Sequence, residues 1–522
     1  MDTRTRRIDP ATAGLLAAAV LYGLLALLVT GLDRQLRWDE VTYLAQVTPG
    51  QPDVWFGPQR ARGMTLVLAP VGLLGAPTAL LRGWLILVHA AAMVWAFRPF
   101  TVLAGWTGVV AATLTAIGWV PLYFAVEGYP NLLAGFASVA AAGATLRWVV
   151  HDERRQLLLV GLAIAVVAWL RPSESVWIAA ALTPVVLVTG RRAWRAVAAF
   201  ALGGFVGWLP WLVEAIVRFG GPFERLAGAR ATSTSGADRN SLIQYLNLIE
   251  GPVRRVVEDP VLTVPGLALL VAAAVLIVLG LLPHGDRARR RVAVVGLWAG
   301  AVMVTPYLVL NAGINLRYLL PGLLLLTLPV AAGVVTVVEV LVRRRSRTGA
   351  VVLAVLALTT VGWQLHLAAR NAADIAALQA RPVALGAALA EAADGAPCAF
   401  LSNVQWPEIQ WHSGCLGEVL VPPSPHLQCP DARRDLGALA ADGYRVFVLE
   451  RGQPPFSPVV ADWPVEQLPE PEDGVWYRYE RPADLGPEAP PSIPPADDPT
   501  QPCLPSRAPD TSDAQLELRW SR

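Results

Sequence analysis

Two adjacent carboxylates, Asp39 and Glu40, directly follow the first long apolar stretch of the chain, in the segment Arg37–Tyr43. Acidic side chains near a bilayer are costly unless they face water or take part in chemistry. A carboxylate beside a reacting hydroxyl can accept its proton as a general base. We therefore predict that Asp39 is a general base, and that Glu40 orients its surroundings or holds an acceptor molecule. The alternative is a solvated pair of loop acids.

A second acid, Glu127, stands in Tyr123–Asn131, near the end of a later apolar run. We expect Glu127 to face Asp39 across a cavity and list it with the catalytic candidates; the alternative is a helix-end acid exposed to water. Two close carboxylates could hold a divalent cation, but the sequence offers no Asp-x-Asp and no third oxygen ligand. We assign no metal and no cofactor, because a divalent cation is unsupported.

Arg317 precedes a long apolar run, and its planar guanidinium suits a phosphate, which it can bind through two hydrogen bonds. A cation there would stabilise negative charge that develops on a leaving phosphate. The alternative is an arginine that reaches from the membrane to its interface. Arg60, Arg62 and Arg171 are secondary candidates for the same role, although Arg171 has a local alternative partner in Glu174.

The composition defines the class of protein. Of the 522 residues, 54% are hydrophobic and only 16% are charged, against roughly 25% in soluble domains. Apolar runs of about 17–25 residues indicate membrane helices. The chain is therefore expected to be a multi-pass membrane protein. The eleven predicted membrane helices are 12–32, 78–97, 101–120, 130–150, 156–170, 174–190, 196–213, 261–282, 292–310, 318–341 and 349–368.

The arginines predict the orientation of these spans. Every basic residue other than histidine is Arg, and the Arg clusters fall on one side of an eleven-span arrangement, which makes that side cytoplasmic. The N-terminus is then cytoplasmic, and the first loop, 33–77, and everything after 369 lie outside. The abundance of Ala, Gly, Pro and Val indicates a bacterial source, and hence a bacterial inner membrane with its lipids as neighbours. No nucleic-acid-binding signature is present.

The C-terminal part changes character. Residues 370–482 read as a small extracytoplasmic α/β domain, with a helix that begins at Pro382 and strands at 398–402, 444–450 and 475–480. Residues 483–522 are Pro-rich and expected to be disordered. If this region lies outside the cytoplasm, a disulfide is expected, with Cys398–Cys415 as first choice; the alternative is free buried thiols.

Several motifs carry a resemblance. Trp38–Ala45 looks like the first-loop Asp-Glu-x-x-Tyr pattern of the GT-C glycosyltransferases, in particular the family 39-like branch of protein O-mannosyltransferases and lipid A aminoarabinose transferases. Tyr123–Asn131 resembles their second outer loop, with Glu127 where Asp is common. Arg60–Gly63 and Asn315–Pro321 resemble the Arg-rich end of the first loop and a late Arg-Tyr-x-x-Pro segment.

The resemblance implies an all-α polytopic membrane bundle, residues 1–369, that carries the small C-terminal α/β domain. It implies an inverting transfer of a hexosyl or pentosyl group from a polyprenyl-phosphate donor to an extracytoplasmic glycan, lipid or protein. Tyr43, Tyr129 and Tyr318 would then contact substrate, unless they belong to an aromatic interfacial belt. The rival hypotheses are a transporter or flippase of lipid-linked glycans, which should show polar mid-span residues and paired broken helices, and a non-catalytic membrane scaffold.

Overall fold

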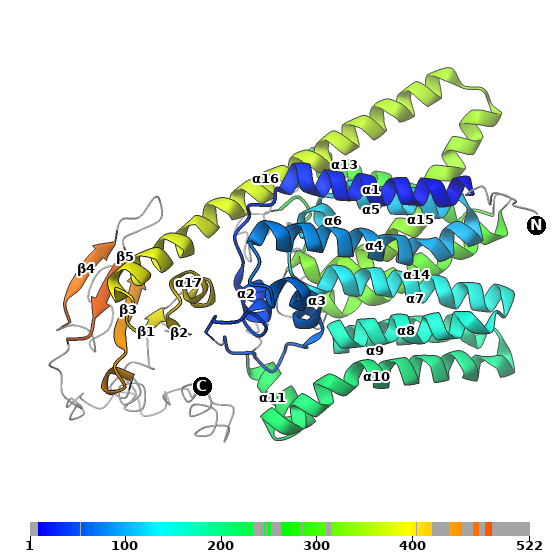
Figure 1. Cartoon of the computed structure of the whole chain (residues 1–522). Coiled ribbons are helices and arrows are strands. Elements are labelled where there is room, and N and C mark those ends of the chain that lie inside the picture. Colours follow the sequence, from blue (N-terminus) through cyan, green and yellow to red (C-terminus); the bar gives the residue numbers. More distant parts are fainter. Residues whose placement is uncertain are drawn as a thin grey trace, which may run out of the picture.

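The computed structural model describes residues 9–52, 54–232, 242, 245–246, 248–251, 263–283, 286–309, 315–402, 405–419, 439–451, 463–468 and 476–482. These residues form a bundle of long, roughly parallel helices and a small domain with a β-sheet at one end of it (Figure 1). We call that end of the bundle the domain-facing end. The expected fold class, a helical membrane bundle with a small α/β domain, is confirmed.

Over the residues that the structure describes, each of the eleven expected spans is largely helical, although 101–120 is divided among α4, α5 and α6. Among the described residues, eight helices are long and apolar enough to cross a membrane, whereas α5, α8 and α9 fall short of that length. The number of crossings therefore stays a prediction. The helices are α1 (Pro10–Thr30), α4 (Thr78–Ala104), α5 (Trp106–Ile117), α7 (Pro130–His151), α8 (Arg154–Leu170), α9 (Pro172–Leu187), α10 (Ala193–Phe219), α13 (Val264–Leu281), α14 (Arg287–Val309), α15 (Leu320–Arg343) and α16 (Arg347–Ala393).

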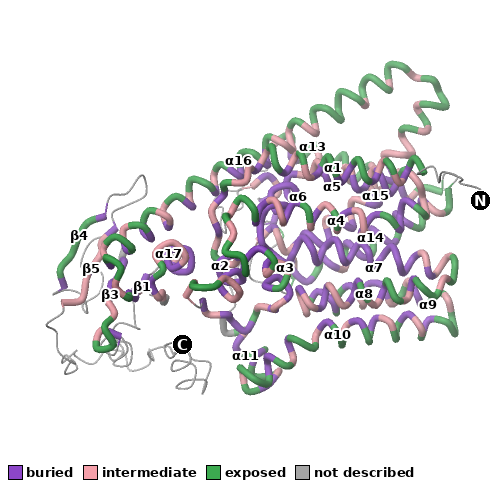
Figure 2. Tube along the Cα trace, viewed as in Figure 1, coloured by how far each residue is buried: buried purple, intermediate pink, exposed green. Residues whose placement is uncertain are grey.

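The centre of the bundle is α7. Its most apolar stretch is 83% buried, whereas the corresponding stretch of α1 is only 28% buried (Figure 2). The sequence of α7 explains this position, because Gly, Ala and Ser along the helix allow neighbouring helices to approach closely. Pro130 begins the helix at a position where its missing N–H costs nothing. The start of α7 is thereby fixed next to Glu127.

Several short helices gather at the domain-facing end, where the bundle meets the small domain (Figure 1). They lie in the segments that connect the long helices, and they carry most of the residues with candidate chemistry. They are α2 (Trp38–Leu44), α3 (Gly63–Gly72), α6 (Trp119–Phe124), α11 (Pro222–Thr232) and the 3₁₀ turn η2 (Leu316–Leu319); a second 3₁₀ turn, η1 (Gly190–Arg192), precedes α10.

The expectation of a separate helix that begins at Pro382 is wrong. Instead, α16 runs without interruption from Arg347 to Ala393, with Pro382 inside it, and joins the bundle to the small domain. Residue 370, where the domain boundary was expected, lies in the middle of this helix. The physical reason is composition: the segment between the two predicted elements is rich in Ala, the strongest helix former, and one proline does not outweigh it.

The small domain is a five-stranded mixed sheet in the order β2-β1-β3-β5-β4. β1 pairs in parallel with β2 and β3, and β5 pairs antiparallel with β3 and β4. The three predicted strands are confirmed as β1, β3 and β5, whereas the four-residue edge strands β2 and β4 were not predicted. The strands are β1 (Cys398–Ser402), β2 (Leu416–Val419), β3 (Arg445–Arg451), β4 (Val465–Leu468) and β5 (Trp476–Glu480), and α17 (Trp406–Ser413) connects β1 to β2.

A disulfide joins Cys398, at the start of β1, to Cys415, just before β2. This is the pair that the sequence put first. The bridge closes the loop that contains α17, so this helix is fixed at both ends of its connection. The two remaining cysteines, Cys429 and Cys503, and the Pro-rich tail 483–522 lie outside the described residues.

Candidate active site

Helix α2 presents its two acids to different surroundings. Successive residues of an α-helix project about 100° apart, so Asp39 and Glu40 cannot face the same way. Glu40 turns back to the start of the helix and accepts a hydrogen bond from the backbone N–H of Arg37 at 3.0 Å. Asp39 points instead toward a group of arginines from distant parts of the chain. The Asp-Glu pair thus belongs to two separate clusters.

The first cluster joins Asp39, Arg60 and Arg317. Arg60 lies 2.7 Å from Asp39 Oδ1, and Arg317 lies 2.7 Å from Oδ2, so the carboxylate is held by two guanidinium groups. The three side chains are 19%, 10% and 16% exposed, which leaves each partly accessible. Burial raises the pKa of Asp39, but Arg317 and Arg60 outweigh it and hold this pKa well below its ordinary value. Asp39 is therefore ionised at physiological pH.

Aromatic rings surround this cluster. The guanidinium of Arg317 lies 4.4 Å from the ring centroid of Tyr129 and 5.3 Å from that of Tyr318. Arg171 also lies 5.3 Å from the Tyr318 ring. Tyr43 is buried against Phe56, and burial together with Asp39 raises the pKa of Tyr43 to about 12. The three candidate substrate-binding tyrosines thus lie close to the Asp39 cluster.

Two of the predicted arginines are engaged elsewhere. Arg62 pairs with Glu214 at 2.8 Å and donates to Gln46 at 2.8 Å, away from Asp39. Arg171 pairs with Glu174 at 2.9 Å, which is the local alternative that the sequence suggested. Of the four arginines, the structure brings only Arg317 and Arg60 into contact with Asp39.

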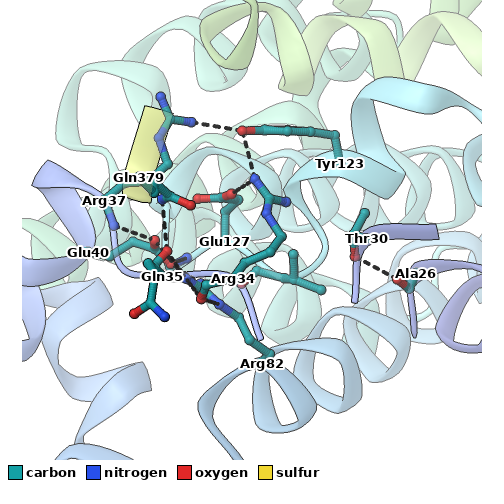
Figure 3. Close-up of polar contacts among 12 residues, drawn as sticks. Ala26, Thr30, Arg34, Gln35, Arg37, Glu40, Arg82, Tyr123, Glu127 and Gln379 are labelled. Carbon is teal, nitrogen blue, oxygen red and sulfur yellow. Dashed lines mark hydrogen bonds and ion pairs between the residues drawn. The ribbon is translucent and has the colours of Figure 1, made fainter. Parts of the chain in front are cut away.

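The second cluster contains Glu40 and Glu127, both of which are sealed inside the protein (Figure 3). Glu40 pairs with Arg82 of α4 and accepts the backbone N–H of Gly128 at 2.7 Å, whereas Glu127 pairs with Arg34 at 2.5 Å. Burial raises the pKa of Glu40 despite Arg82. At Glu127, by contrast, Arg34 and Arg37 outweigh burial and lower the pKa.

The partner that the structure gives to Glu127 is Arg34, so the expectation that Glu127 faces Asp39 across a cavity stays a prediction. Glu127 lies near Glu40, and Arg34, the residue that pairs with Glu127, precedes α2 in the chain (Figure 3). Arg34 and Arg37 both donate to the hydroxyl of Tyr123, at 2.9 and 3.0 Å. This network ties the segment before α2 to α6 and to the start of α7.

Sequence reasoning missed the residues that hold these acids. Arg82 is fully buried and also donates to the backbone carbonyls of Gln35 and Val126, at 2.8 and 2.6 Å. Its signal was a charged residue inside an apolar predicted span, which usually marks a functional or structural partner. Glu214, which pairs with Arg62 and with Arg225, gave a similar signal near the end of another span.

An apolar cavity of about 370 Å³ lies against the η2 turn, which carries Arg317. Leu316 and Leu319, which flank Arg317 and Tyr318 in the η2 turn, both line it. Its other walls come from α5, α6, α13, α14, α15 and α16, and they include Trp119, Leu270 and Leu367. No group of three or more His, Cys, Asp or Glu side chains that could hold a metal occurs in the part of the chain that the structure describes.

No protein-family profile and no curated protein matches the chain by sequence. Solved structures do match it. ArnT from Cupriavidus metallidurans, bound to undecaprenyl phosphate, is 12% identical with a TM-score of 0.60, and the match covers 91% of this chain and 98% of ArnT. The apo oligosaccharyltransferase of Archaeoglobus fulgidus is 14% identical with a TM-score of 0.50, and the match covers 84% and 69% of the two chains.

The chain has the fold of the GT-C glycosyltransferases. The arabinofuranosyltransferase AftD from Mycobacteria shares it as well, at 15% identity and a TM-score of 0.50, over 89% of this chain and 39% of AftD. The predicted resemblance is thus confirmed at the level of the GT-C fold. At these identities the likeness establishes the fold alone, so the roles of individual residues rest on the geometry described above.

Proposed function

We propose that this GT-C protein is a membrane glycosyltransferase that moves a sugar from a polyprenyl-phosphate donor to an acceptor outside the cytoplasm. The observation that carries the proposal is the contact of Asp39 with Arg317, in a turn whose residues Leu316 and Leu319 line an apolar cavity. A carboxylate, a phosphate-binding cation and an apolar cavity are the three elements that such a reaction requires. Undecaprenyl phosphate bound to ArnT supports the donor class.

The donor would lie with its two chemical parts in two environments. Its phosphate would bind Arg317 and Arg60, whose planar guanidinium groups suit phosphate oxygens. Its isoprenoid chain would enter the cavity lined by Leu316 and Leu319, where apolar surface is removed from lipid or water. Tyr129 and Tyr318, which flank Arg317, would border the sugar.

Donor binding would also activate Asp39. Without donor, two arginines hold this carboxylate and make it a weak base. A bound phosphate competes for the same guanidinium groups and brings two negative charges close together. As Arg317 turns to the phosphate, the pKa of Asp39 rises and the carboxylate becomes a better proton acceptor. The base would therefore reach full strength only when the donor is present.

The chemical step follows from this arrangement. The oxygen or nitrogen of the acceptor attacks the anomeric carbon and forms the new glycosidic bond as the bond from that carbon to the phosphate oxygen breaks. The electron pair of the broken bond leaves with polyprenyl phosphate, and Arg317 stabilises the charge. Asp39 takes the proton of the acceptor. A single displacement inverts the configuration at the sugar carbon.

The test is a transfer assay in proteoliposomes with a panel of polyprenyl-phosphate sugars and a cell-envelope extract as acceptor. We expect Asp39→Asn to lower the transfer rate by about 10²–10⁴-fold, the usual contribution of a general base. The matched control is Asp152→Asn, which removes an exposed carboxylate paired with Arg192 between α7 and α8 and should leave transfer unchanged.

Equal rates for Asp39→Asn and wild type would contradict the assignment of the base. Absence of donor consumption by the wild type across the panel would contradict transfer itself. Movement of labelled lipid-linked sugar across the bilayer, measured in the same vesicles, would then favour transport.

A further inference from the structure

Helix α17 of the small domain lies against the first loop, next to the helix that carries Asp39. The rings of Trp406 and Trp38 meet edge to face, with centroids 5.6 Å apart. The side-chain amide of Gln410 donates to the backbone carbonyl of Pro52 at 2.9 Å. The small domain therefore contacts the loop 33–77 at the start of α2 and again after its end.

A buried acid, Glu408, lies in the first turn of α17 between these two contacts. It lies close enough to the backbone of Trp38, the first residue of α2, for that backbone and its own to lower the pKa of its carboxyl against the effect of burial. Its oxygen Oε2 is buried with no hydrogen-bond partner among the described residues. An ionised carboxylate with an unpaired buried oxygen is costly, so this location favours the neutral form.

We infer that Glu408 is a positioning residue, which holds the start of α2 and so fixes the direction of the Asp39 side chain. The inference rests on the proposed function of Asp39. It assigns the small domain a part in catalysis: Glu408 touches neither donor nor acceptor but sets the geometry of the residue that does. The disulfide between Cys398 and Cys415 supports this role, because it secures the connection that carries α17.

The charges around Glu408 give the contact a dependence on pH. Burial raises the pKa of Glu408 to about 8, opposed in part by Arg37, while Asp39 adds to the rise. Among the described residues of α16 and β2, which also pack on α17, no charged group is a main influence on Glu408. His412, one turn further along α17, has a pKa that burial lowers, so it is neutral above pH 7.

The direction of this pH dependence follows from the raised pKa of Glu408. When α17 leaves α2, Glu408 meets water and its pKa returns toward the ordinary value of about 4.3. The closed contact thus binds the proton more tightly than the open one. Closure is most favoured at low pH, and that advantage is lost as the pH rises toward about 8. Asp39 and Arg37 keep their charges over this range, so the change belongs to Glu408.

The experiment compares three variants of the full chain in proteoliposomes. Glu408→Ala should lower kcat by about 10–100-fold with little change in the KM for the donor, because a small misplacement of a reacting group is enough for such a loss. Glu408→Gln mimics the neutral acid and should rescue most of the loss. Glu466→Ala, which removes an exposed acid of the same domain, is the control and should match wild type.

Two further measurements separate positioning from a general loss of structure. The wild-type kcat should decline as the pH rises toward 8, and Glu408→Gln should lack that decline. Hydrogen exchange at the amides of residues 38–45 should be at least about tenfold faster in Glu408→Ala than in Glu408→Gln, since release of the helix start exposes these amides.

Hydrogen exchange needs no turnover, so it tests the inference even if the proposed function fails. Equal kcat for Glu408→Ala and wild type, with unchanged exchange in α2, would overturn the positioning role. A wild type that transfers no sugar, together with faster exchange in Glu408→Ala, would contradict the proposed function and leave the contact itself established.

Discussion

Asp39 and Glu40 are neighbours in the chain but belong to opposite kinds of site. The Asp39 cluster is partly exposed, and its two arginines reach the carboxylate from one side each. The Glu40–Glu127 cluster is sealed, and Arg82 and Arg34 are almost inaccessible within it. An accessible ion pair can exchange its partner for a ligand at low cost, whereas a buried one cannot lose a partner without leaving a charge uncompensated. Carboxylates and arginines are therefore suited to bind and activate ligands in the Asp39 cluster, and to hold the fold together in the Glu40–Glu127 cluster.

The largest loss of stability should follow substitution of the buried Arg82. Arg82→Met keeps most of the side-chain volume but removes the guanidinium that pairs with Glu40 and donates to three backbone carbonyls. Breaking a buried pair in this way costs about 3–5 kcal/mol. Denaturant unfolding in mixed micelles should show this loss of stability. An unchanged unfolding midpoint would mean that the second cluster does not support the fold.

Glu40→Gln should lower the free energy of unfolding by an intermediate amount. The backbone N–H groups of Arg37 and Gly128 donate to different oxygens of Glu40, so the single amide oxygen of Gln can accept only one of them, and the amide no longer neutralises Arg82. Leaving a buried group only partly satisfied costs about 1–3 kcal/mol. The same unfolding measurement should rank this variant between wild type and Arg82→Met. If Glu40→Gln instead abolished sugar transfer with stability intact, Glu40 would belong to the reacting cluster.

Arg317→Met should have the smallest effect on stability and a large effect on binding. Its pair with Asp39 is partly exposed and Asp39 keeps Arg60 as a second partner, so its loss should lower the free energy of unfolding by less than the roughly 3–5 kcal/mol of a broken buried pair. The affinity for polyprenyl phosphate, measured by titration in nanodiscs, should fall clearly. If Arg317→Met were destabilised but still bound the lipid normally, the Asp39 cluster would have the same structural role as the Glu40–Glu127 cluster, which would contradict the comparison.

The sequence predicted the long elements of this fold well, because the signal of a membrane helix is strong and local. A run of apolar residues long enough to cross a bilayer reads the same in any context, and each predicted run is largely helical where the structure describes it. The edge strands β2 and β4 gave no such signal, since each has only four residues and is stabilised by hydrogen bonds to one neighbouring strand. The length of α16 was missed because a single proline was given more weight than a long Ala-rich stretch.

The candidate site was predictable in its residue types but not in its pairings. The sequence picked out Asp39, Arg317 and Arg60, and the structure brings them together although the two arginines lie far apart in the chain. It could not show that Glu127 pairs with Arg34, because several arginines and acids compete and only the packing of helices decides among them. Glu408 carried no signal at all, since its burial comes from contact between the small domain and the first loop.

The uninterrupted helix α16 would couple the position of the small domain to the tilt of a helix that can cross a membrane. At 1.5 Å per residue its 47 residues span about 70 Å, far more than the hydrocarbon layer, so one part of it would lie in the membrane and the rest would extend beyond it to the small domain. Membrane helices change their tilt when the thickness of the lipid changes. A change of about 5° over an arm of about 35 Å displaces the far end by roughly 3 Å, given that helical rise. A displacement of that size equals the length of a hydrogen bond, so a change in lipid thickness would be enough to make or break the contact between α17 and α2.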